Sequence, residues 1–300
     1  MNRDSVDWAG AMPAIVTIFD DQGRIDNDAM RDNIERMLDA GASGVLVGGC
    51  TGEFWALSSS ERSDLFKLGA ECVAGRGVVL AGTGAVTVEE TVQLTRAAAD
   101  AGCSGALILP PYFIRLSDDE VFEHYRAVDS LVDMPVVLYN IPGNALNAIT
   151  PTLAARLAEL EHVVAIKESS GDWNNFYATL IRVKDSIRVF CGPSSIFGVP
   201  AVAAGADGFI DCFPNVWLPG GIRMFEAAAS GNLQEANDLQ ETGRRLTDLF
   251  TSEGRSLYPA TKAAMNYLGH RAGGPRAPLQ PLRGAALDGL HAGLDGLDIN

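Results

Sequence analysis

Lys167 ends the apolar run Val163–Ile166 in this chain of 300 residues. Lysine is seldom buried without a partner, so the ordinary interpretation is that its side chain caps a strand and extends into solvent. The other three lysines, Lys67, Lys184 and Lys262, lie in segments with helical periodicity, where an ammonium group can reach water along its stem. Burial of Lys167 would lower its pKa and provide a free amine that can attack a ketone carbon.

Two further segments have, at the end of an apolar run, side chains that could act on a substrate together with the Lys167 amine. The segment Gly48–Glu53 contains Cys50 and Thr51 between glycines. Its accessible backbone N–H groups and the Thr51 hydroxyl suit a carboxylate, although the same pattern also fits an ordinary tight turn. Tyr139 ends another apolar run and, taken alone, could be a half-buried core aromatic. If Tyr139 and Lys167 end neighbouring strands, about 4.8 Å apart, a phenol and an amine can act on one substrate.

Composition excludes several other classes of function. A net charge of −15 with scattered basic residues argues against binding to nucleic acid or to an anionic membrane. No apolar run approaches the roughly 20 residues that span a bilayer, and the acidic N-terminal segment does not resemble a secretory signal. Five scattered cysteines and four separate histidines show no metal-ligand spacing. We therefore expect a soluble, cytoplasmic protein without a metal site.

Short apolar runs recur about every 25 to 35 residues, and each precedes a stretch of helical periodicity, which is typical of βα units. The expected strands are 13–18, 44–48, 78–81, 105–109, 135–139, 162–167, 187–191 and 207–211. Helices are expected at 29–40, 61–74, 88–101, 118–130 and 152–160, several of them after a capping box. Eight such units predict an α/β fold, a (β/α)8 TIM barrel, over residues 1–214.

The remaining residues, 215–300, show only helical periodicity, so we expect a C-terminal helical region packed on the barrel. Its helices are expected at 222–230, 232–250, 257–269 and along a final stripe of Leu287, Leu290, Leu294 and Leu297 that faces the barrel. Chemistry in such barrels occurs at the C-terminal ends of the strands, where Thr51, Tyr139 and Lys167 are expected to lie.

These segments, in this order, resemble the dihydrodipicolinate synthase and N-acetylneuraminate lyase family of pyruvate-type class I aldolases. The resemblance covers nearly the whole chain and rests on the segments 49–53, 109–112, 139–142, 166–172, 205–210 and 262–265. It implies a (β/α)8 barrel with C-terminal helices, usually a tetramer, that forms a Schiff base between Lys167 and the ketone of a 2-oxo acid. It implies no metal and no organic cofactor.

The resemblance also implies roles for individual residues. Lys167 would attack C2 of the substrate, Tyr139 would carry protons, and Thr51 with the backbone of the 50–51 turn would hold the carboxylate. The other expected substrate-binding residues are Gly49, Cys50, Gly52, Phe113, Asn144, Gly192 and Ile210.

Three positions depart from the synthase for which the family is named. In that synthase a threonine and a tyrosine lent by a neighbouring subunit continue the proton relay, whereas this chain has Cys50 and Phe113. A thiol is a weak hydrogen-bond donor and phenylalanine is none, so both changes disable the relay. Asn144 replaces the arginine that would hold the carboxylate of the second substrate. These departures argue against the namesake synthase, although the Schiff-base residues are retained.

We therefore expect a Schiff-base lyase or aldolase that forms or cleaves a 2-oxo acid, with pyruvate as the enamine-forming half and an aldehyde as the other. A dehydratase or deaminase of a 2-keto-3-deoxy acid or a cyclic imine uses the same iminium and stays open. A catalytically silent barrel that binds a metabolite is a third alternative, against which the retained Lys167, Tyr139 and Thr51 argue. The chain is expected to assemble as a homo-oligomer, a tetramer or a dimer.

Overall fold

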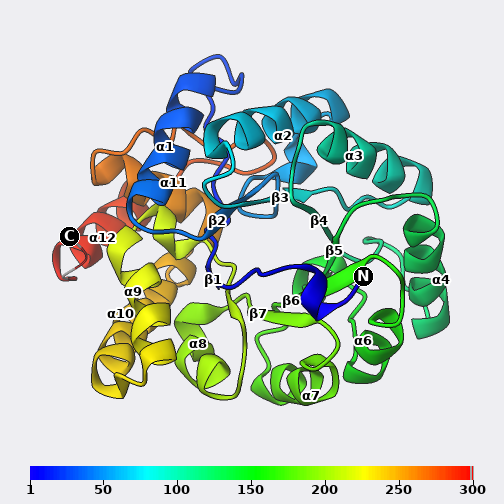
Figure 1. Cartoon of the computed structure of the whole chain (residues 1–300). Coiled ribbons are helices and arrows are strands. Elements are labelled where there is room, and N and C mark those ends of the chain that lie inside the picture. Colours follow the sequence, from blue (N-terminus) through cyan, green and yellow to red (C-terminus); the bar gives the residue numbers. More distant parts are fainter. Residues whose placement is uncertain (298, 300) are drawn as a thin grey trace.

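The computed structural model describes residues 1–297 and 299 and contains eight parallel strands arranged as a barrel (Figure 1). Their order around the barrel is β1-β8-β7-β6-β5-β4-β3-β2. The strands are β1 (Gly10–Ala11), β2 (Gly44–Val47), β3 (Val78–Gly82), β4 (Gly105–Ile108), β5 (Val136–Asn140), β6 (Val163–Glu168), β7 (Arg188–Cys191) and β8 (Gly208–Phe209). Backbone hydrogen bonds from Leu46 to Pro13 (2.9 Å) and from Ile15 to Leu46 (3.1 Å) join the chain after β1 to β2. The predicted (β/α)8 barrel is confirmed.

The first strand is much shorter than the range 13–18 expected from the sequence, and it begins three residues earlier. Pro13 has no N–H to donate to a strand ladder. The N–H of Val16 donates to the side chain of Asn215 (3.2 Å), and that of Ile18 contacts the Met30 sulfur (3.2 Å). The apolar run is buried as predicted, but only its first residues, 13–15, pair with β2, and side chains satisfy the N–H groups of Val16 and Ile18.

Helices surround the strands (Figure 1). Those of the barrel are α1 (Asn27–Asp39), α2 (Ser59–Val73), α3 (Val88–Asp100), α4 (Asp118–Asp129), the short α5 (Pro142–Ala145), α6 (Pro151–Leu157), α7 (Trp173–Val183) and α8 (Ser194–Ala203), with 3-10 turns η1 (Arg3–Ser5), η2 (Phe54–Ala56) and η3 (Phe213–Asn215). Complete capping boxes begin α2 at Ser58 and α4 at Ser117, as their sequences predict.

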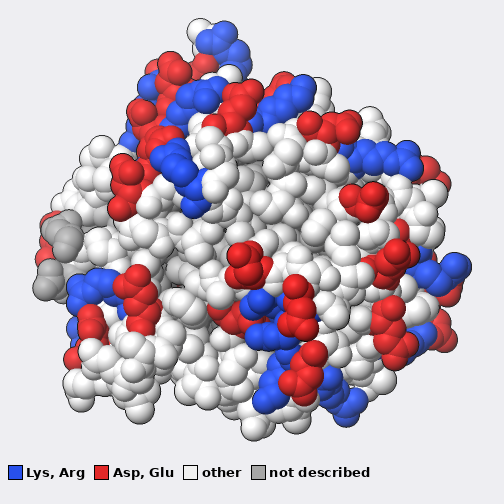
Figure 2. All heavy atoms as spheres, in the orientation of Figure 1, with Lys and Arg blue, Asp and Glu red and all other residues white. Residues whose placement is uncertain are grey.

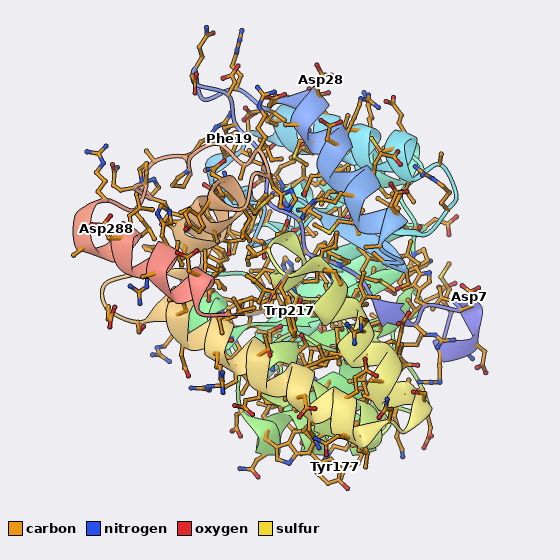
Figure 3. All side chains as sticks on the ribbon, turned by 90° about the vertical axis from the view of Figure 1, so that its left-hand side faces the viewer. Asp7, Phe19, Asp28, Tyr177, Trp217 and Asp288 are labelled. Carbon is orange, nitrogen blue, oxygen red and sulfur yellow. The ribbon has the colours of Figure 1, made fainter. Side chains whose placement is uncertain are left out.

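Four further helices follow β8: α9 (Leu218–Ser230), α10 (Leu233–Thr251), α11 (Leu257–Tyr267) and α12 (Gly284–Asp295). Helix α10 packs on α8 and α9, and α12 packs on α10 and α11. Figure 3 shows these helices along one side of the barrel, with Trp217 among them. Leu290 and Leu294 of the expected leucine stripe are buried. The division of the chain after residue 214 stays a prediction.

The barrel interior forms its own apolar cluster, separate from the layer between strands and helices. Because side chains alternate along a strand, Val137 and Tyr139 of β5 both point inward, and so do Ala165 and Lys167 of β6. Trp8 belongs to this cluster and packs against Gly105 at the start of β4. The N-terminal segment crosses the face of the barrel that Figure 1 shows. On that face, acidic and basic side chains are interspersed around the perimeter and near the middle (Figure 2). None of the described helices is long and apolar enough to cross a membrane.

Candidate active site

Strands β5 and β6 place Tyr139 directly beside Lys167. The two residues are register partners, and the Lys167 Nζ atom lies 4.3 Å from the centre of the Tyr139 ring. Lys167 is 5% exposed and Tyr139 is 4% exposed. The lysine therefore does not extend into solvent, and the phenol lies within reach of any ligand that the amine touches.

The environment of Lys167 favours the free amine. Burial lowers its pKa to about 8, although the Cys50 thiol and the Asp211 carboxyl oppose this shift. With a pKa near 8, about 10% of the molecules hold a neutral amine at pH 7, whereas for an ordinary lysine the fraction is only about 0.03%. The free amine needed for attack on a carbonyl is thus available near neutral pH.

A cavity of about 180 Å³ lies over Lys167 and Tyr139, between the ends of β2, β5, β6, β7 and β8 and helices α10 and α11. Six of the residues predicted from the sequence line it: Cys50, Thr51, Tyr139, Lys167, Gly192 and Ile210. At Gly192 a Cβ atom would collide with the Ser169 hydroxyl, so the close approach of these two cavity-lining residues requires glycine.

The loop after β2 carries Thr51 into the cavity wall. Gly49 and Gly52 are buried behind this wall instead of lining it. The Thr17 hydroxyl donates a hydrogen bond to the Gly52 carbonyl (2.6 Å), and a Cβ atom at Gly52 would lie only 3.2 Å from this hydroxyl oxygen. The two glycines therefore shape the loop, and Thr51 lines the cavity.

A buried ion pair holds the far end of the same loop. Glu53 adopts a left-handed conformation (φ 55°), and its carboxylate lies 2.5 Å from the Lys262 Nζ atom. Both side chains are at most 1% exposed. The second carboxylate oxygen of Glu53 accepts a hydrogen bond from the Arg276 N–H (2.9 Å). The C-terminal region thus fixes the loop that carries Thr51.

A tyrosine that was not predicted from the sequence enters the site from the C-terminal helices. The hydroxyls of Tyr258, on α11, and Tyr139 both face the Cys50 thiol, and Tyr258 also faces the Asn144 side chain. Burial raises the pKa of Cys50 and of both phenols, so all three keep their protons at neutral pH. No local signal marked Tyr258, because its position depends on how α11 packs against the barrel.

Phe113 and Asn144 do not line the cavity. Phe113 is 89% exposed and has a left-handed backbone (φ 78°). Asn144 lies in α5 and is also exposed. The structure therefore places Phe113 outside the site of its own chain, and a role in substrate binding would require a second subunit.

Asp211 is an acidic group that lines the cavity and was not predicted from the sequence. It follows β8, and its carboxyl accepts hydrogen bonds from the Ser194 hydroxyl and the Phe213 N–H. Burial raises its pKa to about 7, and the nearby Lys167 opposes this rise. Its position in the sequence was a usable signal, since Asp211 directly follows the run Gly208–Ile210 just as Lys167 directly follows the run Val163–Ile166.

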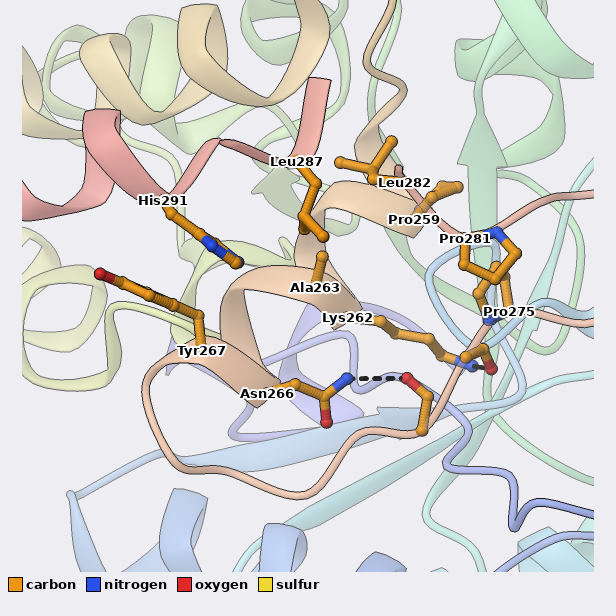
Figure 4. Close-up of a pocket in the computed structure, with 12 residues that line it drawn as sticks. Pro259, Lys262, Ala263, Asn266, Tyr267, Pro275, Pro281, Leu282, Leu287 and His291 are labelled. Carbon is orange, nitrogen blue, oxygen red and sulfur yellow. Dashed lines mark hydrogen bonds between the residues drawn. The ribbon is translucent and has the colours of Figure 1, made fainter. Parts of the chain in front are cut away.

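A second hollow, of about 370 Å³, lies between α11, α12 and residues 273–282 (Figure 4). Its walls are mostly proline and apolar side chains, and its one lysine, Lys262, already contacts Glu53 and donates a hydrogen bond to the Gly274 carbonyl (3.0 Å). Among the described residues no cluster of three or more histidine, cysteine or acidic side chains could hold a metal ion. The cavity over Lys167 is thus the candidate active site.

Comparison with known proteins gives a match over nearly the whole chain. The model of the dihydrodipicolinate synthetase family matches residues 7–296. The chain belongs to this family. It is 35% identical over 276 residues to 4-hydroxy-tetrahydrodipicolinate synthase of Methanothrix thermoacetophila. This alignment covers 92% of each of the two chains. Family membership makes the chain a pyruvate-dependent Schiff-base lyase of the class I aldolase type, as the sequence predicted.

Solved structures of the family have the same fold. Dihydrodipicolinate synthase of Bacillus anthracis superposes with a TM-score of 0.92 at 28% identity, covering 97% of this chain and 99% of that one. The chloride-inhibited enzyme of Acinetobacter baumannii, complexed with pyruvate, gives a TM-score of 0.91 at 28% identity with the same coverage. The barrel and the C-terminal helices are therefore both features of the family.

Proposed function

We propose that this protein cleaves or forms a 2-oxo acid through an imine between Lys167 and the substrate ketone, with pyruvate as the enamine-forming half. The observation that carries this proposal is a buried amine of lowered pKa beside a phenol, at the floor of a cavity at the strand ends. The lysine itself supplies the electron sink, so the proposed reaction needs no metal and no organic cofactor.

In the cleavage direction, the Lys167 amine attacks C2 of the 2-oxo acid, and loss of water leaves an iminium. The C4 hydroxyl then loses its proton as the C3–C4 bond breaks, and the electron pair of that bond enters the enamine. An aldehyde departs, the enamine takes up a proton at C3, and water hydrolyses the imine to release pyruvate. Tyr139 would carry these protons, and its ring, 4.3 Å from the Lys167 Nζ atom, supports this role.

The substrate carboxylate would lie against the loop after β2. The Thr51 hydroxyl and the backbone N–H groups of residues 50 and 51 supply donors there, while Gly192 and the Ile210 carbonyl bound the opposite side of the cavity. Held in this way, the substrate would present C2 to the Lys167 Nζ atom.

A dehydratase or deaminase is the second candidate, and Asp211 is the observation that favours it. Elimination requires a group that removes a proton from C3 and a group that protonates the leaving hydroxyl or amine. Tyr139 and Asp211 both face Lys167, one from β5 and one from the end of β8. Product analysis separates the candidates: pyruvate with an aldehyde indicates cleavage, and one product that lacks water or ammonia indicates elimination.

The experiment that tests the proposed function is reduction of the imine. Borohydride added with pyruvate should leave a stable adduct on Lys167, which mass spectrometry of the digested protein locates. The Lys167→Ala variant should give no adduct and no turnover. Absence of an adduct across a range of 2-oxo acids would instead support a silent metabolite-binding barrel.

We also propose that the chain forms a homo-oligomer in the cytoplasm. The strongly exposed Phe113, beside the partly exposed Ile114, supports an interface at this loop, because a large apolar side chain gains stability when a second subunit covers it. The five cysteines are free and buried, which supports a reducing compartment.

A further inference from the structure

The charges in the cavity restrict what the second half of the substrate can be. Among the described residues that line the cavity, Lys167 is the only cation and Asp211 is the only acid. In the proposed function Lys167 is consumed as the imine, and its positive charge is balanced by the substrate's own carboxylate. No second cation is left for another anionic group.

The rest of the wall near Asp211 is neutral and rich in hydroxyl groups. Ser195, Thr247 and Thr251 line the cavity beside α8 and α10, and the Ser195 and Thr247 hydroxyls lie 2.7 Å apart. Tyr258 adds a phenol on the side of α11. Such groups form hydrogen bonds with a hydroxylated ligand but cannot neutralise a carboxylate.

Asp211 is fixed in a position to act on this part of the substrate. The Ser194 hydroxyl and the Phe213 N–H hold its carboxyl. Strand β8 lies two strands from β6, so the backbones of Asp211 and Lys167 are separated by about 10 Å, and a substrate tail can extend between their side chains. A carboxylate accepts hydrogen bonds from hydroxyl groups and repels a second carboxylate.

We propose that Asp211 is a specificity-determining residue that restricts the tail beyond C3 of the 2-oxo acid to uncharged, hydroxylated groups and excludes anionic ones. This inference rests on the proposed function, because it concerns ligands attached to Lys167.

The test compares rates of imine trapping at pH 8, at which the Asp211 carboxyl is mostly ionised. Four 2-oxo acids serve as probes: pyruvate, 2-oxopentanoate, 2-oxoglutarate and 2-keto-3-deoxygluconate. The second and third are a matched five-carbon pair that differ in a terminal methyl or carboxylate group. Cyanoborohydride traps each imine, and mass spectrometry measures the total adduct on Lys167, so the readout does not depend on turnover.

The wild-type protein should trap 2-oxopentanoate at least about tenfold faster than 2-oxoglutarate, and 2-keto-3-deoxygluconate fastest of the tailed acids. The Asp211→Asn variant keeps the shape of the side chain and removes its charge. In this variant the ratio of the two trapping rates, 2-oxopentanoate over 2-oxoglutarate, should fall to about threefold or less. Asp211→Ser should behave in the same way and provides a second variant if the first folds poorly. Asp185→Asn removes an acid at an exposed position outside the cavity and should leave this ratio unchanged.

Equal trapping of the matched pair by the wild-type protein would overturn the proposal, and so would an undiminished ratio in both Asp211 variants. Trapping of 2-keto-3-deoxygluconate no faster than 2-oxopentanoate would also overturn it. Failure of the proposed function is a separate result, since pyruvate itself would then give no adduct on Lys167 in any variant.

Discussion

The reactivity of Lys167 should follow a titration with its midpoint near pH 8. A pKa of about 8 leaves roughly 1% of the amine neutral at pH 6, 10% at pH 7 and half at pH 8. Imine formation with pyruvate should therefore accelerate about ninefold from pH 6 to pH 7 and about fivefold from pH 7 to pH 8, and it should level off above pH 9. The carboxylate of pyruvate is ionised throughout this range, so the change in rate with pH reports the titration of a group on the protein.

The midpoint is the balance of two opposing effects. Burial lowers the pKa of Lys167 and is the larger effect; the groups that raise it are Cys50, Asp211, Cys212 and Cys191. Replacement of Asp211 by asparagine removes a negative charge that favours the ammonium form. The pKa of Lys167 should then fall below 8, so the Asp211→Asn variant should form the imine faster than the wild-type protein at pH 7.

The assay mixes protein with limiting pyruvate at each pH and quenches the imine by reduction at successive times. Adduct on the Lys167 peptide then gives the rate constant. Asp185→Asn is the matched control, because it removes the same charge at an exposed position and should keep the wild-type midpoint. A rate that keeps rising tenfold per pH unit up to pH 10 would refute the assignment of a buried amine, and an upward shift in Asp211→Asn would refute the balance described above.

Three further changes test other parts of the structure. Tyr139→Phe should slow turnover by roughly 10²–10⁴-fold in a steady-state assay while the imine can still be trapped, and unchanged turnover would remove Tyr139 from proton transfer. Glu53→Gln leaves the ammonium group of Lys262 buried without a counter-ion, so the free energy of unfolding in urea should fall by about 3–5 kcal/mol, and adding Lys262→Met should restore part of it. Phe113→Asp should weaken self-association at least about tenfold in sedimentation equilibrium, and an unchanged association constant would place the interface elsewhere.

Residues whose positions follow from the periodicity of the strands could be predicted from the sequence. Lys167 and Tyr139 each end a buried run, and alternation along neighbouring parallel strands is enough to bring them together. The barrel followed from the spacing of eight such runs. The exception is the segment 13–18, whose apolar pattern resembles that of a strand although Asn215, distant in sequence, supplies a hydrogen-bond partner for its backbone.

Residues whose positions depend on tertiary packing could not be predicted in this way. Tyr258 lies in an amphipathic helix, and nothing in its neighbours shows that α11 presents it to the cavity. Asp211 directly follows a short apolar run, and an acid in that position is normally assigned to a solvated loop. Only the closure of the barrel shows that the end of this run faces the cavity. The exposure of Phe113 likewise depends on a left-handed backbone that its own sequence does not favour.

The C-terminal helices form part of the cavity wall as well as of the scaffold. Lys167 is charged more easily in the unfolded chain, since its pKa there is near 10.5 and near 8 in the folded state. Below pH 8 its burial therefore lowers stability, and this cost is lost as pH rises from 8 to about 10.5. Packing elsewhere in the protein must offset this cost. Separately, the Lys262–Glu53 ion pair joins α11 to the loop that carries Thr51 into the cavity wall. Because Tyr258 comes from the same helix, displacement of α11 would disturb both the loop that carries Thr51 and the cavity wall.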